Sequence, residues 1–301
     1  MDNNTSLTRV VAGGFWIALG SIVISIGGFV FWFITSRLAN IEAVGYATTA
    51  FSIASVLSGI LNLGLGTAML REVPERKSKA YISGLIIALS MGFISFAIIP
   101  IFAKIYEGFN IYIPLILLMT LSMLVSRVSI FALIGCIKPV KVFITQSLSI
   151  AARFITGITL VIIGLGALGI TYGLLAGILT SLGISVVLTI ISIGIAKPSI
   201  KDLFEVLKLG VSNYPYTLST QIITTLSVTI LAILLCNPEL TGAFYIDVMI
   251  ILAISSIPAA LLGIGLPVSI VSGDKSVTVS YTHLRAHETS LHLVCRLLLE
   301  K

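Results

Sequence analysis

Charged residues are scarce in this chain. They make up 10% of its 301 residues, whereas a typical soluble domain carries about 25%. Cysteine is also rare, with three in the whole sequence, while hydrophobic residues reach 57%. This composition excludes a disulfide-rich secreted scaffold, a disordered chain and an ordinary cytosolic enzyme. Apolar runs of about 20 residues recur along the chain. This pattern predicts an all-α, polytopic membrane helix bundle.

Histidine is absent from the first 278 residues, and all three histidines lie in the last 23. That last segment, Val279–Lys301, reads VSYTHLRAHETSLHLVCRLLLEK and resembles a translated sequencing adapter. A metal-binding histidine cluster or a basic amphipathic helix is the alternative interpretation. We expect a non-native tail that takes no part in the fold. The natural part would then be Met1–Thr278, truncated before its true C-terminal part.

Eight apolar spans precede the tail, and each is long enough to cross about 30 Å of hydrocarbon as a helix. Their approximate bounds are Val11–Thr35, Gly45–Met69, Tyr81–Phe102, Tyr112–Ile137, Val140–Gly164, Ala167–Ile195, Tyr214–Cys236 and Gly242–Val271. Before the seventh span, Ile200–Leu207 is either an amphipathic helix along the membrane interface or a charged linker. Pro215, at the start of the seventh span, either opens a local cavity or marks the first helical turn, and we expect the second.

Lysine and arginine are distributed unevenly over the loops. Eleven lie before span one or after spans two, four, six and eight, against two in the alternate loops, Arg37 and Lys104. By the positive-inside rule, this predicts a multi-pass protein of the cell (plasma) membrane with a cytoplasmic N-terminus. The cations are spread over loops and do not cluster on one face, so a nucleic-acid partner is not expected.

The motif N-x-E-x-x-G occurs twice, at Asn40–Gly45 and at Asn237–Gly242, 197 residues apart. Because an even number of spans separates the copies, they share one orientation. The repeat predicts two lobes related by an axis along the membrane normal, as in some alternating-access transporters. We assign residues 1–196 to a first six-helix lobe, 197–278 to the start of a second lobe, and 279–301 to the tail.

Two arginines lie near the middle of apolar spans, Arg127 in the fourth and Arg153 in the fifth. A central arginine costs about 2.5–3.5 kcal/mol even on the lenient insertion scale, and neither span holds an acid. Guanidinium pairs well with phosphate through two parallel hydrogen bonds. Both residues are therefore candidates for binding a phosphate-bearing substrate. Snorkelling, or a bond to a carbonyl of a neighbouring helix, is the alternative.

Other polar residues inside the spans are weaker candidates. Gln146 and Gln221 are candidates for donating to sugar hydroxyls, although such residues more often bond neighbouring helices. Asp247 is interpreted as a coupling-ion or proton site, as a partner of Arg37 near the outer face, or as part of a solvated wall. The sequence holds no P-loop, GxSxG or HExxH motif and no metal-ligand cluster, so we expect no catalytic residue, metal or cofactor.

The segment from Gly13 to Glu72 resembles the opening of polysaccharide and oligosaccharide flippases. These belong to the multidrug/oligosaccharidyl-lipid/polysaccharide exporter superfamily. The matching features are a glycine near the start of span one, Ser36-Arg37-Leu38 with an acid before Gly45-Tyr46, and a glycine-rich end of span two that leads into Arg71.

The resemblance implies two lobes of six or more helices around a central cavity. It also implies that polyprenyl-diphosphate-linked oligosaccharide moves from the cytoplasmic to the outer leaflet, with no bond made and with cationic residues engaging the diphosphate. The implied partners are this lipid-linked oligosaccharide, membrane lipids, and glycan polymerase or ligase enzymes. Arg127 and Arg153 fit that chemistry by their position, although no fixed family motif covers them.

Two alternatives stay open. An ion-coupled drug or metabolite exporter of the same superfamily would want acidic cavity residues for a cationic drug, whereas spans one to six hold no acid in their cores. The second alternative is a non-transporting membrane scaffold for glycan assembly. A scaffold would not explain why two arginines lie at a costly depth in the membrane.

Overall fold

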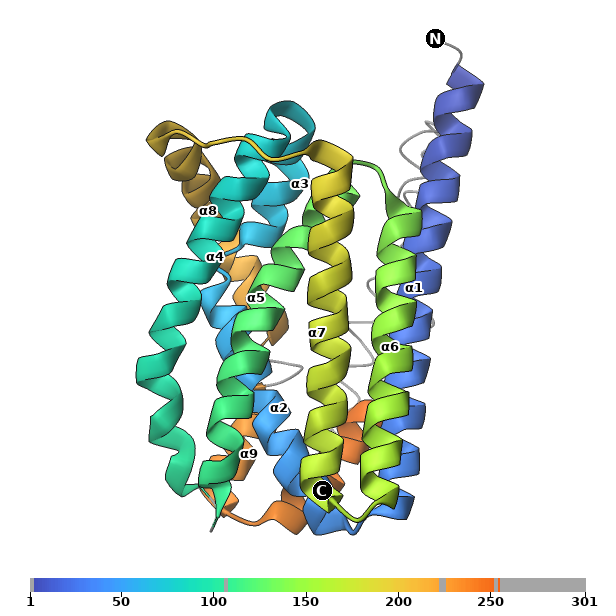
Figure 1. Cartoon of the computed structure of the whole chain (residues 1–301), viewed down its shortest axis with the longest axis vertical. Helices are drawn as coiled ribbons and strands as arrows, with labels where there is room; N and C mark the ends of the chain where they lie inside the picture. The colour runs from blue at the N-terminus through green and yellow to red at the C-terminus, as the bar shows by residue number, and fades with distance from the viewer. Residues whose placement is uncertain (1–2, 106–107, 222–225, 252–253, 255–301) are drawn as a thin grey trace, which may run out of the picture.

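The computed structural model describes residues 3–105, 108–221, 226–251 and 254, and the regular structure in these ranges is helical (Figure 1). The elements are α1 (Asn3–Leu38), α2 (Ile41–Leu61), α3 (Leu65–Arg76), α4 (Ser78–Ile98), the 3-10 turns η1 (Ile99–Lys104) and η2 (Phe109–Tyr112), α5 (Ile113–Gly135), α6 (Pro139–Ile162), α7 (Gly166–Ile193), α8 (Ile200–Gln221) and α9 (Ser227–Leu235). A further helix covers residues 238–251. The predicted all-α bundle is confirmed, and the segment 279–301 lies outside the described residues.

Within the described residues, six helices are long and apolar enough to cross a membrane. They cover Gly13–Leu38, Ile41–Leu61, Ser78–Phe102, Phe109–Gly135, Pro139–Ile162 and Gly166–Ile193, and each overlaps one of the first six predicted spans. The seventh predicted span is described as the end of α8 and as α9, and the helix over 238–251 begins the eighth. The chain is a multi-pass membrane protein.

The second predicted span is two helices and not one. α2 ends at Leu61 and α3 begins at Leu65, with positive φ angles of 47° at Leu63 and 70° at Gly64 between them. A Cβ atom on Gly64 would overlap the carbonyl oxygen of Gly210 in α8. The break therefore lets the backbone of α8 pass close to the α2–α3 corner, which only glycine permits.

The amphipathic run Ile200–Leu207 is helical and forms the first part of α8, so the linker interpretation is wrong. Ser199 starts this helix, because its backbone N–H and hydroxyl donate to Asp202 Oδ2 at 2.9 and 2.7 Å while its hydroxyl accepts from the Asp202 N–H. Pro215 lies inside α8, and the expectation that it marks a first turn is also wrong. α8 packs on α3 and α4 (Figure 1).

Arg76 ties the end of α3 to the start of α8. Its guanidinium lies 3.1 Å from Glu72 and 3.2 Å from Asp202, and it also pairs with Glu205. The hydrogen bond with Glu205 raises the pKa of Arg76. Hydrogen bonds from Ser199, followed by the charges of Lys79 and Arg76, hold the pKa of Asp202 below its usual range.

Arg76→Gln is expected to lower the melting temperature of the detergent-solubilised protein, because it removes these three ion pairs at once and leaves the buried carboxylate of Glu72 without its cation. Arg71→Gln is the matched control, since Arg71 is exposed and lies outside the cluster. Equal melting temperatures for the two variants at neutral pH would contradict the role given to Arg76.

The stabilisation by Asp202 should depend on pH. Its pKa is lowered in the folded protein, so its contribution is complete above the unfolded value of about 4 and is lost as the pH falls through the lowered value. The difference in melting temperature between wild type and Arg76→Gln should therefore shrink below about pH 4. A difference that stays constant down to acidic pH would argue against a role for the carboxylates.

Candidate functional site

The two copies of the N-x-E-x-x-G motif play the same local role. The side-chain oxygen of Asn40 accepts from the Ala43 N–H at 2.8 Å, and that of Asn237 accepts from the Leu240 N–H at 3.1 Å. Each asparagine thus caps the helix that follows it, a position that asparagine favours. Ala43 and Leu240 are themselves related by the 197-residue register of the repeat.

The glycines of the two motifs meet each other. A Cβ atom on Gly45 would overlap the carbonyl oxygen of Pro238, and one on Gly242 would lie 2.6 Å from the carbonyl oxygen of Ile41. Ile41 and Pro238, like Gly45 and Gly242, are 197 residues apart. The contact is therefore reciprocal, as a two-fold relation between two copies requires.

Arg153 of α6 points into the bundle. Its guanidinium carbon lies 5.8 Å from the ring centroid of Phe31 in α1. On the other side, a Cβ atom on Gly177 of α7 would lie 3.1 Å from the Arg153 Cβ atom and 3.5 Å from its Nε atom. That Nε atom is buried and has no hydrogen-bond partner among the described residues. Tyr245, in the helix over 238–251, lies within electrostatic range.

Arg127 of α5 also lies on an interior face. Met123 and Phe131 are one turn away on either side and share this face. The Ser58 hydroxyl of α2 donates to the sulfur of Met123 at 3.6 Å, and a Cβ atom on Gly66 of α3 would lie 2.9 Å from the Phe131 ring. Arg127 is half-buried. Its helix face is therefore directed at α2 and α3 rather than away from the bundle.

The two arginines lie at neighbouring levels of α7. The hydroxyl of Ser126, next to Arg127, is 2.8 Å from that of Ser181 in α7. Arg153 packs beside Gly177, one turn earlier in the same helix. α5 and α6 flank α7 on either side (Figure 1). The structure thus brings both charges to a similar depth, while a cavity shared by both stays a prediction.

Gln146 lies on the same face of α6 as Arg153, two turns away. A Cβ atom on Gly20 of α1 would lie 3.2 Å from its Cδ atom, so the amide is held between α1 and α6. Its Oε1 atom is buried and has no hydrogen-bond partner in the described part of the chain. Gln221 ends α8, and its side chain lies outside the described residues.

Asp247 and Arg37 do not pair, so that interpretation of Asp247 is wrong. Asp247 is exposed, and within the described ranges neither residue takes part in an ion pair. The guanidinium carbon of Arg37 instead lies 5.5 Å from the ring centroid of Phe33. Ile246, Met249 and Ile250 of the helix over 238–251 face α1, and Asp247 does not lie on that face.

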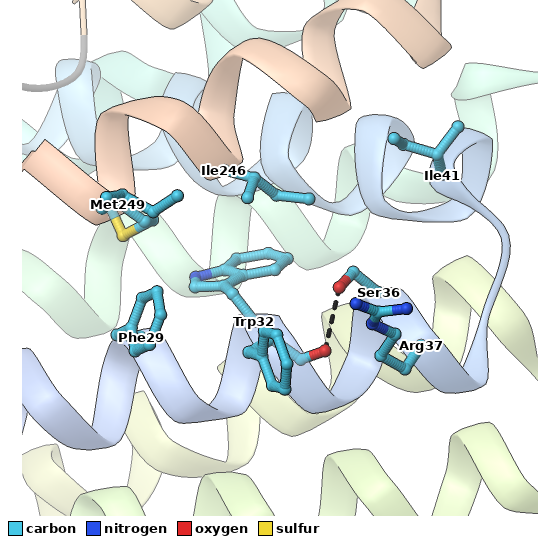
Figure 2. Close-up of a pocket in the computed structure, with 9 residues that line it drawn as sticks. Phe29, Trp32, Ser36, Arg37, Ile41, Ile246 and Met249 are labelled. Atoms are coloured by element: carbon cyan, nitrogen blue, oxygen red, sulfur yellow. Dashed lines mark hydrogen bonds between the residues drawn. The ribbon is translucent and has the colours of Figure 1, made fainter.

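A cleft of about 390 Å³ separates α1 from the helix over 238–251 (Figure 2). It is lined by Phe29, Trp32, Phe33, Ser36, Arg37, Ile41, Ile246, Met249 and Ile250. The Ser36 hydroxyl donates to the Phe33 carbonyl at 2.9 Å. The cleft is therefore apolar with one cation, and neither Arg127 nor Arg153 lines it. Sequence reasoning missed it, although Phe29, Trp32, Phe33 and Arg37 recur at helical spacing.

Gly45→Ala is expected to destabilise the protein by about 1–3 kcal/mol, because the added methyl group meets a backbone carbonyl that cannot rotate away. Gly28→Ala is the control, since a Cβ atom there has nothing within 4 Å, and alanine favours a helix by about 1 kcal/mol over glycine. Thermal unfolding in detergent measures both. A Gly45→Ala variant as stable as Gly28→Ala would contradict the close contact.

No protein-family model and no curated protein matches this chain. Solved structures do resemble it. A MOP superfamily transporter from Pyrococcus furiosus, described as having a binding pocket of reversed polarity, is 18% identical, with 99% of this chain and 72% of that chain covered at a TM-score of 0.60.

Two further solved transporter structures also resemble this chain in fold. An outward-facing multidrug resistance MATE family transporter of the MOP superfamily is 19% identical, with 99% of this chain and 73% of that chain covered at a TM-score of 0.63. The MATE multidrug transporter DinF-BH is 16% identical, with coverages of 89% and 64% and a TM-score of 0.59. At such identities the likeness concerns the fold, and this chain has the helical fold of MOP superfamily transporters.

Proposed function

We propose that this chain is a membrane exporter that moves a polyprenyl-diphosphate-linked oligosaccharide from the cytoplasmic to the outer leaflet. The observation that carries the proposal is the inward orientation of two arginines at similar depth, one of which has a buried Nε–H without a hydrogen-bond partner among the described residues. A buried donor of this kind costs free energy unless a ligand accepts its hydrogen bond.

A diphosphate is the ligand that best suits such a site. Moving it across a membrane removes it from water, and compensating cations with well-directed donors reduce that cost. Guanidinium groups supply both charge and paired N–H donors. Gln146, on the same α6 face as Arg153, adds an amide that would donate to a sugar hydroxyl, and Gln221 has the same role in the proposal. Asp247 and Arg37 are left as candidates for an ion or gating role.

The proposed function requires a membrane and an orientation of the protein in it. The N-terminus lies in the cytoplasm and the protein in the plasma membrane, so the Arg76 cluster is at the cytoplasmic end and the two capped motifs are at the outer end. Residues 1–196 form the first lobe and 197–278 begin the second. Glycan polymerase or ligase enzymes are the proposed partners, since they would use the delivered lipid-linked oligosaccharide.

Export of drugs is the second candidate. It is favoured by the fold that this chain shares with MATE multidrug transporters. Against it, the first six spans hold no acid in their cores to attract a cationic drug. The Pyrococcus furiosus transporter, whose reversed pocket polarity is described as suggesting a different function, supports the idea that pocket charge decides substrate in this fold.

Arg127→Ala and Arg153→Ala are each expected to reduce complementation of a flippase-deficient strain at least about tenfold, because a desolvated phosphate loses its charged partner. Arg→Lys at either position should restore part of the activity, since it keeps the charge and loses the paired donors. Arg71→Ala, an exposed cation outside both sites, is the control and should behave as wild type.

Membrane expression is measured for every variant in this assay, so that loss of activity is separated from loss of protein. Full complementation by both alanine variants would overturn the assignment of the arginines to the substrate. Efflux of a cationic dye that continues in Arg127→Ala and Arg153→Ala would favour the drug exporter instead.

A further inference from the structure

The cleft between α1 and the helix over 238–251 has an apolar floor that opens to the side of the bundle. Trp32 forms its base and is 2% exposed, while Phe33 on its rim is 49% exposed. Ile246 and Met249 lie across from Trp32 on the opposite wall (Figure 2). Aromatic and aliphatic side chains of this kind match a hydrocarbon chain, and they offer nothing to a polar solute.

One cation stands at the end of this floor. Arg37 lies in the last turn of α1, at the end of the membrane-length helix Gly13–Leu38. Its guanidinium carbon lies 5.5 Å from the Phe33 ring centroid, within cation–π range, and within the described residues it pairs with no acid. A cation–π contact involves the charge of the group and uses none of its N–H donors as hydrogen bonds to an acceptor oxygen, so these donors can bind an anion.

We propose that this cleft binds an anionic phospholipid, with its phosphate at Arg37 and one acyl chain along the floor toward Phe29. Arg37 lies at the end of the membrane-length helix, which is the level of lipid headgroups. Phe29 lies eight residues earlier, or about 12 Å deeper along the helix. A soluble anion would leave the apolar floor unused, and an uncharged hydrocarbon would leave Arg37 unused.

The bound lipid links the two copies of the repeat. One wall of the cleft is α1, from the first copy, and the other is the helix over 238–251, from the second. A lipid that contacts both walls has an affinity that depends on their separation, so its binding favours the arrangement described here over one in which the helices move apart. This inference does not depend on which substrate the protein moves.

Trp32 reports on the cleft directly. The chain has two tryptophans, so Trp16→Phe leaves Trp32 as the single tryptophan, whose emission is excited selectively over that of tyrosine at long wavelength. The variant protein is reconstituted into phosphatidylcholine vesicles that contain an equal minor fraction of brominated-chain phosphatidylglycerol or brominated-chain phosphatidylcholine. We expect phosphatidylglycerol to quench Trp32 more strongly at the same mole fraction. Arg37→Gln should reduce that preference about fivefold, Arg37→Lys should keep most of it, and the control Arg71→Gln should leave it unchanged.

Equal quenching by the two lipids would overturn the proposal, as would a preference that survives Arg37→Gln. Displacement of the brominated phosphatidylglycerol by an equimolar polyprenyl phosphate would also overturn it, because the cleft would then belong to the substrate. An unchanged Trp32 emission maximum in each variant checks the fold. The assay contains no oligosaccharide, so its failure is distinct from a failure of the complementation experiment.

Discussion

The placement of the helix over 238–251 against the preceding helices depends on one close backbone contact, where Gly45 and Gly242 let the starts of two helices meet without side chains between them. Each glycine follows an asparagine that caps its helix. The direction in which the chain enters each of the two helices is therefore fixed at equivalent positions of the repeat. The contact brings the helix over 238–251 against α1, where Tyr245 packs edge-on against Trp32 with ring centroids 4.9 Å apart. The apolar cleft and the surroundings of Arg153 both follow from that placement.

A second constraint comes from the hydrocarbon environment. Arginine at mid-depth is costly wherever it faces lipid, and this chain directs both mid-depth arginines inward, with small residues opposite Arg153. Gly173 and Gly177 of α7 make room for the Arg153 backbone and side chain, and Gly66 lets Phe131 approach α3 on the face that carries Arg127. The glycines of α7 therefore give Arg153 room to lie inside the bundle, in addition to letting α6 and α7 pack closely.

The sequence predicts the six described spans because each is a long apolar run, a signal that does not depend on tertiary contacts. It does not predict the break at Leu63 and Gly64, since the apolar run continues through both residues and the reason for the break is the approach of Gly210. The continuity of α8 through Pro215 likewise depends on docking against α3 and α4. The repeat was visible as a pattern, but its physical role as cap and contact required the structure.

Among the candidate site residues, the sequence identifies the arginines because a charge inside a membrane is costly. It does not predict which side chains of a helix face a cleft, because that depends on the rotation of the helix about its axis. Asp247 differs from Ile246 by one position, yet Ile246 lines the cleft and Asp247 does not. The cleft itself joins α1 to residues more than 200 positions later, and a single sequence carries no signal for such a pairing.

We propose that the inward-facing arginines bind a diphosphate on a lipid. This role is tested by the affinity of the purified protein for three ligands with one polyprenyl chain, ending in diphosphate, monophosphate or alcohol. We expect the affinity to fall in that order, and we expect Arg153→Ala to remove most of the difference between diphosphate and alcohol. Equal affinity for the diphosphate and the alcohol would contradict it.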